Sequence, residues 1–302
     1  MTDEPVNSLV LPYIEANAVE VKAVTLTLHV HKKNRFGFYI LEFRAWLYRR
    51  HRLRRFLRWP YIYDFGGCAP RRIGPNTFIK SSSKLRFVEA QTMAFVRAHT
   101  SIPVPQLFEV LLDTNGRPYI VMEYIDAPEL TKVWSSLTED QQGDIIKQIG
   151  KWWSELRQIP SPGPAICALD GGPTLDNSAR DFGPCHSFED FASYYGYFIL
   201  RGRCDTSIEA ILENFLAKEH RIVFTHCDLA PRNILVKDGH IAAIIDWECA
   251  GWFPEYWEAL QIVYANGLQI PDFGNKLVKA VFPEFQDEHR LEFELNKYIF
   301  RG

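Results

Sequence analysis

The sequence predicts an α+β protein with two lobes, a small β-rich lobe followed by a larger helical one. Three observations predict this fold class. Short apolar runs separated by glycine and proline turns occupy residues 61–126. Helical periodicity dominates from residue 127 to the end. The 302 residues are 47% hydrophobic and 24% charged, which is typical of a folded chain with a sizeable core.

The elements of the small lobe follow from its turns. Gly66-Gly67 and Gly74-Pro75-Asn76 interrupt the first apolar runs, and Asn115-Gly116 between two apolar runs is a strong hairpin signal. Between these turns, residues 84–99 are rich in helix formers with apolar residues at helical spacing. We expect strands at 61–65, 71–73 and 77–80, a helix at 84–99, and strands at 107–112 and 119–125.

The larger lobe, residues 127–302, is expected to be mainly helical. The Gly/Pro-rich stretch 160–184 predicts a long loop or an insertion. Three short apolar runs surround polar loops in the middle of the lobe, and Asp238-Gly239 predicts a hairpin between the last two. We expect helices at 138–158, 188–200, 208–219 and beyond 256, and strands at 222–225, 234–237 and 241–245.

Residues 1–60 differ in charge from the rest of the chain. They hold eleven lysines and arginines against five acids, a net charge of +6, so the remaining residues sum to −9 within a total of −3. A helix is predicted at 36–59, where seven arginines and no acid occupy residues 44–58. Such a helix suits weak contact with an anionic membrane, or packing on the main domain with its arginines solvated. We therefore treat 1–60 as a basic N-terminal extension. A strand signal precedes the helix at 19–30.

Composition excludes several classes of protein. The net charge of −3 argues against a chain that binds nucleic acid along its length. No uncharged apolar run reaches the roughly 18 residues of a membrane-spanning helix, and the first residues carry no secretory leader pattern. The six cysteines are scattered, which favours free thiols in a reducing compartment. We expect a cytoplasmic protein that is a monomer.

The strongest chemical signal is a polar loop between two apolar runs. His226 and Asp228 follow the run 222–225, and Asn233 lies five residues after Asp228. Eighteen residues after Asp228, Asp246 ends a further apolar run. Each residue alone most often caps a turn. Phosphoryl transfer, however, requires this set: one carboxylate orients the attacking hydroxyl, while an amide oxygen and a second carboxylate hold Mg²⁺ at the phosphates.

The small lobe contains a matching lysine and glutamate. Lys80 ends the strand predicted at 77–80, and Glu89 lies nine residues later on the predicted helix. In phosphoryl transfer enzymes a strand lysine contacts the nucleotide phosphates and a helix carboxylate holds it. A lysine at the end of a strand is usually only solvated. The presence of Asp228, Asn233 and Asp246 later in the chain favours a role for Lys80 in contacting nucleotide phosphates.

With these motifs the chain resembles the aminoglycoside phosphotransferase/choline kinase-like family, and within it fungal proteins with an aminoglycoside phosphotransferase domain. The resemblance covers residues 61 to about 260. It implies a bilobal protein-kinase-like fold with ATP between the lobes. The matching segments lie at 78–80, 89–97, 102–105, 120–124, 225–233 and 245–258.

The resemblance also implies roles for individual residues. Asp228 is the expected catalytic base, and Asn233 and Asp246 are the expected Mg²⁺ ligands. Lys80, held by Glu89, is expected to contact phosphate. The backbones of Glu123 and Ile125 are expected to meet the adenine.

The chain departs from the family pattern at three places. Cys227 stands where the family usually has glycine between the histidine and the aspartate. The loop 66–70 is a poor copy of a phosphate-binding loop, and residues 1–60 lie outside the resemblance. These departures favour one alternative, a kinase-like pseudo-enzyme that binds a nucleotide or metabolite without turnover. A thiol at Cys227 is either inert and buried or a site of oxidation.

The expected acceptor is a hydroxyl on a small molecule. The metal aspartate opens Asp246-Trp247-Glu248 rather than Asp-Phe-Gly, and Ala230 stands where protein kinases usually have lysine. The aromatic residues between 182 and 198 form either helix core or an acceptor pocket. A cationic acceptor would need acidic walls. The alternative, at least as well supported for most of the candidates, is a solvated acidic surface. The candidate acids are Asp170, Asp176, Asp181, Glu189, Asp190, Glu255 and Glu258.

Overall fold

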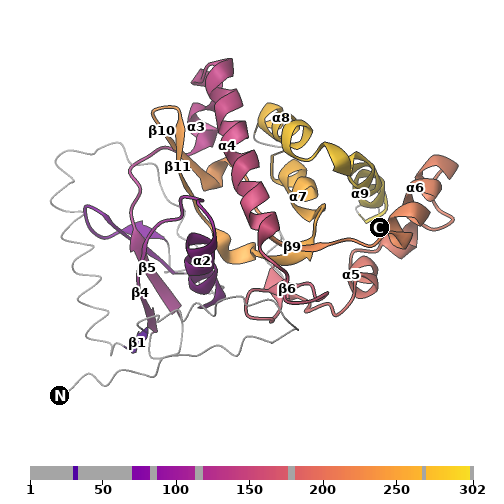
Figure 1. The fold of residues 1–302 in the computed structure, drawn as a ribbon, viewed down its shortest axis with the longest axis horizontal. Helices are drawn as coiled ribbons and strands as arrows, with labels where there is room; N and C mark the ends of the chain where they lie inside the picture. Colours follow the sequence, from indigo (N-terminus) through magenta and orange to yellow (C-terminus); the bar gives the residue numbers. More distant parts are fainter. Residues whose placement is uncertain are drawn as a thin grey trace. The chain divides into compact units, whose positions relative to one another are not determined.

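The computed structural model describes residues 30–32, 70–81, 87–112, 118–175, 181–266 and 270–299. They divide into two compact units (Figure 1). The first unit holds the described residues up to 98 and 104–126, and the second holds 99–103 and the described residues from 127 onward. The helix predicted at 36–59, with its expected membrane contact, and the strand predicted at 61–65 lie outside the described residues.

The first unit is built on a five-stranded sheet in the order β1-β4-β5-β3-β2. Ile79 of β3 and Val121 of β5 are buried at its core, against Ile73 and Tyr119. Strand β1 runs parallel to β4, whereas the other neighbours are antiparallel. The elements are β1 (Val30–Lys32), β2 (Arg71–Arg72), β3 (Thr77–Lys80), α2 (Phe87–His99), β4 (Leu107–Leu112) and β5 (Pro118–Glu123).

The first unit confirms the predicted strands at 71–73, 77–80, 107–112 and 119–125 to within two residues. The antiparallel register of β4 and β5, which pairs Leu112 with Pro118, is that of the predicted hairpin. Strand β1 shares only Val30 with the strand predicted at 19–30. Because β1 pairs with β4, the sheet includes residues 30–32 of the segment 1–60, which we treat as a separate extension because of its charge.

The second unit is mainly helical. Its longest helix, α4, begins at a capping box in which Thr138 and Gln141 exchange side-chain to backbone hydrogen bonds. Helix α4 packs against α8, and α6 packs against α9 (Figure 1). The helices are α3 (Leu130–Val133), α4 (Glu139–Gln158), α5 (Phe188–Tyr194), α6 (Thr206–Ala217), α7 (Trp257–Asn266), α8 (Pro271–Val281) and α9 (Gln286–Ile299), with 3-10 turns η1 (Trp134–Ser136), η2 (Tyr197–Leu200), η3 (Pro231–Asn233), η4 (Trp247–Cys249) and η5 (Pro283–Phe285).

Among the described residues of the second unit, three small sheets accompany the helices. One is the predicted hairpin β10–β11, and the others have the orders β6-β12-β9 and β7-β8. Inside the second of these, an ideal Cβ on Gly251 would lie 2.4 Å from the carbonyl oxygen of Cys167, so only glycine fits there. The strands are β6 (Cys167–Ala168), β7 (Thr174–Leu175), β8 (Asp181–Phe182), β9 (Ile222–Thr225), β10 (Ile234–Lys237), β11 (His240–Ile244) and β12 (Gly251–Pro254).

Two expectations for this unit are refined by the structure. The stretch 160–184, expected as a long loop or an insertion, contributes the short strands β6, β7 and β8. The helix predicted at 188–200 is two elements, because Gly196 adopts φ 73° between α5 and η2. That left-handed conformation ends a helix and is readily adopted by glycine.

None of the helices in the described part of the chain is long and apolar enough to cross a membrane.

Candidate active site

The loop after β9 is tied to the end of β11 through His226. The buried His226 ring lies 3.1 Å from the carbonyl of Ile245 through Nε2 and accepts the Asp228 backbone N–H through Nδ1 at 3.2 Å. These two bonds assign the proton to Nε2. The ring of Trp247 packs 4.4 Å away, measured between centroids. His226 therefore supports the loop rather than reacting.

The Asp228 carboxylate is held by two neighbours on the next turn. Arg232 donates from Nη2 to both carboxylate oxygens at 2.6 Å, and Asn233 donates from Nδ2 to Oδ2 at 2.9 Å. Burial raises the pKa of Asp228 above its ordinary value, Arg232 opposes this effect, and the charge of Asp246 adds to it. The carboxylate is thus fixed in direction and more basic than an exposed one.

Asn233 is oriented by the short turn η3. Its amide nitrogen donates to both the backbone oxygen and Oδ2 of Asp228, so the amide oxygen takes part in neither bond. The Ile245 N–H donates to the backbone oxygen of Asn233 at 2.9 Å, which brings the residue before Asp246 against η3. The sequence-predicted residues Asp228, Asn233 and Asp246 therefore belong to one polar cluster.

Backbone strain is concentrated at this cluster. Cys227 has φ 67° and Asp246 has φ 68°, the left-handed region that L residues other than glycine rarely adopt. Strain of this kind costs about 1–3 kcal/mol per residue and collects at functional sites. It also explains the glycine of the family pattern at position 227, since glycine adopts this conformation without strain.

The thiol of Cys227 is buried beside Glu258. Burial, together with the nearby Glu258 and Cys249, raises its pKa well above the ordinary value for cysteine. A buried, protonated thiol is a poor nucleophile and a poor target for oxidants. This environment favours the inert interpretation of Cys227.

Glu258 is a site residue whose position the sequence did not reveal. It is 1% exposed on α7, and its Oε2 accepts the Cys227 backbone N–H at 3.0 Å. Its interpretation as an acidic wall for a cationic acceptor is therefore wrong, because its carboxyl lies behind the loop. Burial raises its pKa to about 8 against an ordinary value of 4.5. Within the sequence it is one acid in an apolar helix, a weak signal of burial.

Replacing Glu258 with glutamine is expected to remove a pH dependence of stability. Between about pH 4.5 and 8 the folded state holds this proton and the unfolded state releases it, so the free energy of unfolding falls as pH rises. The slope is at most about 1.4 kcal/mol per pH unit. Glutamine keeps an acceptor for the Cys227 N–H but does not titrate. Urea unfolding at pH 5, 6.5 and 8 measures the free energy of unfolding of both proteins. The value for wild type minus the value for the variant should decrease as pH rises. A difference that stays constant with pH would contradict the assignment.

In the first unit, Lys80 and Glu89 form the predicted pair. Lys80 Nζ lies 2.8 Å from Glu89 Oε1, and the two side chains are 15% and 1% exposed. A carboxylate this buried is stable only with a partner. The residues expected to meet the adenine come next along the chain: the Glu123 N–H, at the end of β5, donates to the Gln106 carbonyl at 2.8 Å, and Ile125 lies in the irregular stretch after it.

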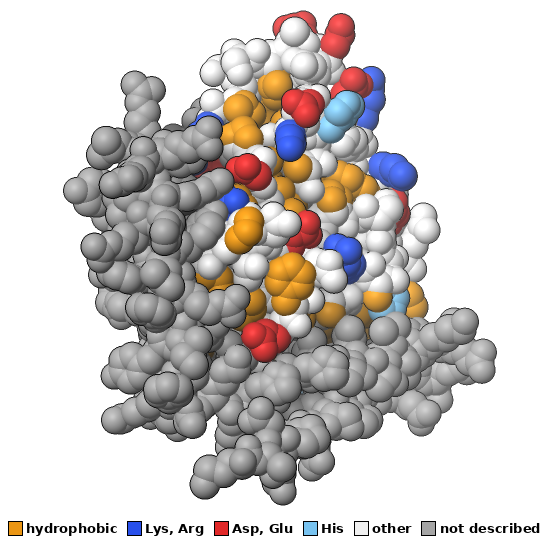
Figure 2. Space-filling model, turned by 90° about the vertical axis from the view of Figure 1, so that its left-hand side faces the viewer, with side chains coloured by type: hydrophobic (Ala, Val, Ile, Leu, Met, Phe, Trp, Pro, Cys, Tyr) orange, Lys and Arg blue, Asp and Glu red, His pale blue; other side chains and the backbone are white. Residues whose placement is uncertain are grey.

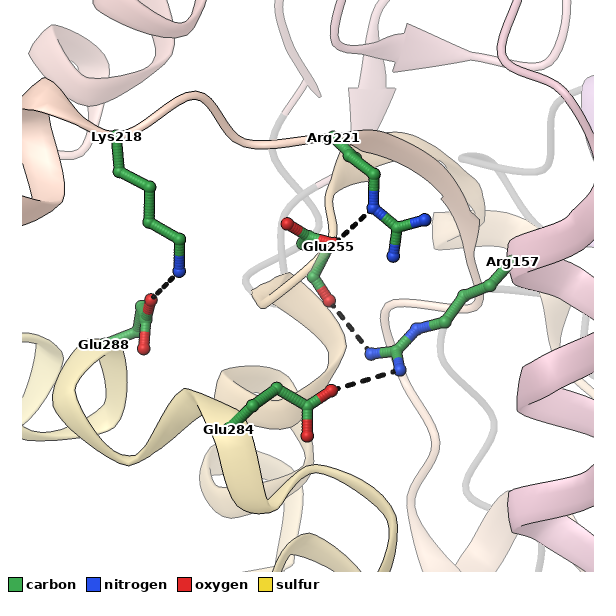
Figure 3. Close-up of polar contacts among 6 residues, drawn as sticks. All are labelled: Arg157, Lys218, Arg221, Glu255, Glu284 and Glu288. Atoms are coloured by element: carbon green, nitrogen blue, oxygen red, sulfur yellow. Dashed lines mark hydrogen bonds and ion pairs between the residues drawn. The ribbon is translucent and has the colours of Figure 1, made fainter.

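The remaining acidic candidates are dispersed. Glu255 is engaged, since its carboxylate accepts from Arg221 at 2.7 Å and its backbone oxygen from Arg157 at 3.3 Å (Figure 3). The same view shows Arg157 reaching Glu284 and Lys218 reaching Glu288. The Arg157 contacts link α4 to Glu255 and to η5, whereas the separate Lys218–Glu288 pair links the end of α6 to α9. Asp170, Asp181, Glu189 and Asp190 are exposed, and Asp176 lies outside the described residues.

The aromatic residues near 182–198 mostly form core. Phe182 and Phe191 are buried and pack with Phe253 and Trp257 of the following elements. Tyr194 stacks on Phe182 at 5.0 Å and remains 48% exposed. The core interpretation of the cluster is therefore confirmed for its buried members.

The residues at the cluster suit a magnesium site that is completed by phosphate. Among the described residues no group of three or more His, Cys, Asp and Glu side chains could hold a metal alone. An amide oxygen and one carboxylate, at Asn233 and Asp246, are the kind of partial set to which Mg²⁺ adds water and substrate phosphates. The side-chain oxygens of Asn233 and Asp246 therefore fit the ligand preference of Mg²⁺.

Comparisons with known proteins bear on the family and the fold. The sequence model of the phosphotransferase enzyme family, APH, matches residues 82–274. Subtelomeric hrmA-associated cluster proteins from two strains of Aspergillus fumigatus are 38% identical over 66 residues, 21% of this chain. The match spans only 13% of the length of those curated relatives.

Solved structures show the same fold at low sequence identity. Aminoglycoside 2'-phosphotransferase-IIIa in its GDP complex has a TM-score of 0.53 at 12% identity, covering 83% of this chain and 87% of that one. ADP-bound aminoglycoside phosphotransferase APH(2'')-Ib has a TM-score of 0.52 at 15% identity, covering 85% and 90%. These likenesses support the α+β kinase-like fold.

Proposed function

Because the chain belongs to the phosphotransferase enzyme family, we propose that it transfers the γ-phosphoryl group of ATP to a hydroxyl of a small molecule. The observation that carries the proposal is the Asp228 carboxylate, fixed by Arg232 and Asn233 within a strained loop. A carboxylate so placed can orient an attacking hydroxyl and accept its proton.

The proposed reaction has one chemical step. The acceptor hydroxyl gives its proton to Asp228 as its oxygen bonds to the γ-phosphorus. The bond from the γ-phosphorus to the β–γ bridging oxygen breaks, and that oxygen leaves on ADP with the electron pair. Burial, which raises the pKa of Asp228, makes the carboxylate a better proton acceptor.

Nucleotide binding is assigned to the remaining predicted residues. Lys80, paired with Glu89, would contact phosphate, and the backbones of Glu123 and Ile125 would meet the adenine. Asn233 and Asp246 would hold Mg²⁺, which neutralises phosphate charge when bound. In this proposal residues 61–126 serve nucleotide binding and residues 127–302 serve catalysis and acceptor binding.

A thermal-shift titration is expected to show stabilisation by ATP with Mg²⁺. A ligand that binds only the folded state adds about 2.7 kcal/mol of stability at 100 times its Kd. Omitting Mg²⁺ should remove most of the effect, because Asn233 and Asp246 hold the nucleotide through the metal. The same thermal-shift titration with GTP and Mg²⁺ is the matched comparison. No stabilisation by either nucleotide would remove the kinase proposal.

The alternative is a pseudo-enzyme that binds a nucleotide or metabolite. Its support is the atypical loop at 66–70 and the cysteine at position 227. An ATP-consumption screen across aminoglycosides, amino alcohols, sugars and other alcohols separates the two. Acceptor-dependent ADP release favours the enzyme, whereas nucleotide binding without any turnover favours the binding module.

A further inference from the structure

The guanidinium of Arg232 forms a salt bridge with the carboxylate of Asp228, the proposed base. Arg232 Nη2 is 2.6 Å from both oxygens of Asp228, and the Arg232 side chain is 40% exposed. A guanidinium stays protonated at all ordinary pH values and carries five N–H donors. In the described residues its hydrogen bonds to Asp228 use only Nη2. Part of the guanidinium therefore faces solvent beside the carboxylate at which an acceptor hydroxyl must arrive.

Three carboxylates of the larger lobe that could face a polycation are engaged with other groups. Asp228 is paired with Arg232, Glu258 is buried behind the loop, and Glu255 is bonded to Arg221. On the face shown in Figure 2, acidic side chains of the described residues stand apart among hydrophobic and basic ones and form no continuous patch.

Given the proposed phosphotransferase function, on which this inference rests, we propose that Arg232 determines the charge class of the acceptor. The hydroxyl that receives phosphate is carried by a neutral or anionic molecule, such as a polyol, a sugar or a hydroxy acid, and not by a polyamine. A like charge beside Arg232 disfavours an ammonium group. The solvent-facing donors of the guanidinium suit a hydroxyl, a carboxylate or a phosphate.

The test determines the charge class without knowing the acceptor. Small molecules extracted from the source cells are separated into cation-retained, anion-retained and unretained fractions. Each fraction is incubated with the full-length protein, Mg²⁺ and ATP labelled in the γ-phosphate, and label in small molecules is measured. Glucosamine, glucose and glucuronate, which share one ring and differ in charge, form a defined panel.

Label is expected in the anion-retained or unretained fraction, at least about tenfold above the cation-retained one. Arg232→Gln should reduce that ratio, and Arg232→Lys should largely keep it. Arg290→Gln is the control: it removes one positive charge from α9, where Arg290 contacts Ser207. It should leave the ratio of label between the fractions unchanged.

Two results would overturn the inference while leaving the proposed function intact. One is preferential labelling of the cation-retained fraction, and the other is a ratio that Arg232→Gln does not change. A protein that is stabilised by ATP with Mg²⁺ but labels no fraction would fail as a phosphotransferase, and the inference would fall with it.

Discussion

Replacing Asp228 with asparagine is expected to lower acceptor-dependent turnover by about 10²–10⁴-fold, the usual contribution of a general base. Asparagine keeps the size of the side chain and an oxygen for the Arg232 and Asn233 donors. It cannot take the acceptor proton. Nucleotide affinity should hardly change, because Lys80 and the proposed metal ligands remain. Turnover is measured with an acceptor from the screen, and affinity with a nucleotide titration.

Asp246→Asn is the matched comparison for this prediction. Both changes remove one carboxylate from the same polar cluster. A proposed metal ligand, however, serves nucleotide binding and turnover together, so Asp246→Asn should weaken both. If Asp228→Asn lost nucleotide binding while Asp246→Asn kept it, the two roles would be reversed. If neither change affected an observed activity, that activity would belong to another site.

Replacing Gly251 with alanine is expected to have the largest effect on stability. The new Cβ would lie 2.4 Å from the Cys167 carbonyl oxygen and 3.2 Å from the Ala168 Cα, both in the backbone of the neighbouring strand. Strand β12 lies between β6 and β9, so it cannot move without disturbing the pairing to β9, the strand before the catalytic loop. We expect a loss of about 3 kcal/mol, near the upper end for overpacking, and a decrease in Tm of about 6–12 °C.

Gly143→Ala provides the control in a helix. Gly143 lies inside α4, and an added Cβ would meet nothing within 4 Å. This change should raise stability by about 0.5–1 kcal/mol, because alanine is the better helix former. Thermal unfolding of both variants measures the contrast. A Gly251→Ala protein as stable as wild type would show that β6 and β12 do not approach this closely.

Much of the fold could be predicted from local patterns. The strand β3, the helix α2 and the hairpin β4–β5 each carry their own periodicity and turn residues, so their existence followed from short windows of sequence. The Lys80–Glu89 contact was also anticipated, because phosphoryl transfer enzymes pair a strand lysine with a helix carboxylate. The catalytic and metal-binding roles of Asp228, Asn233 and Asp246 stay predictions that the proposed experiments test.

What local patterns could not show depends on partners far along the chain. Strands β6, β7 and β8 have two residues each, too few for any periodicity, and they exist because distant backbone groups pair with them. Strand β12, with four residues, also depends on pairing with the distant strands β6 and β9. Glu258 resembles a surface acid in sequence, and only the packing of α7 behind the loop turns it into a buried acceptor for the Cys227 N–H.

By itself the sequence determined the order of the main elements, the family, and the spacing of the polar loop, because these depend on residues close together in the chain. The tertiary structure decided what surrounds each side chain. It brought Arg232 onto both oxygens of Asp228 and placed Glu258 behind Cys227. It also gave Cys227 and Asp246 left-handed backbones. The physical reason is that burial, charge pairing and strain are properties of neighbours in space, which short-range spacing does not specify.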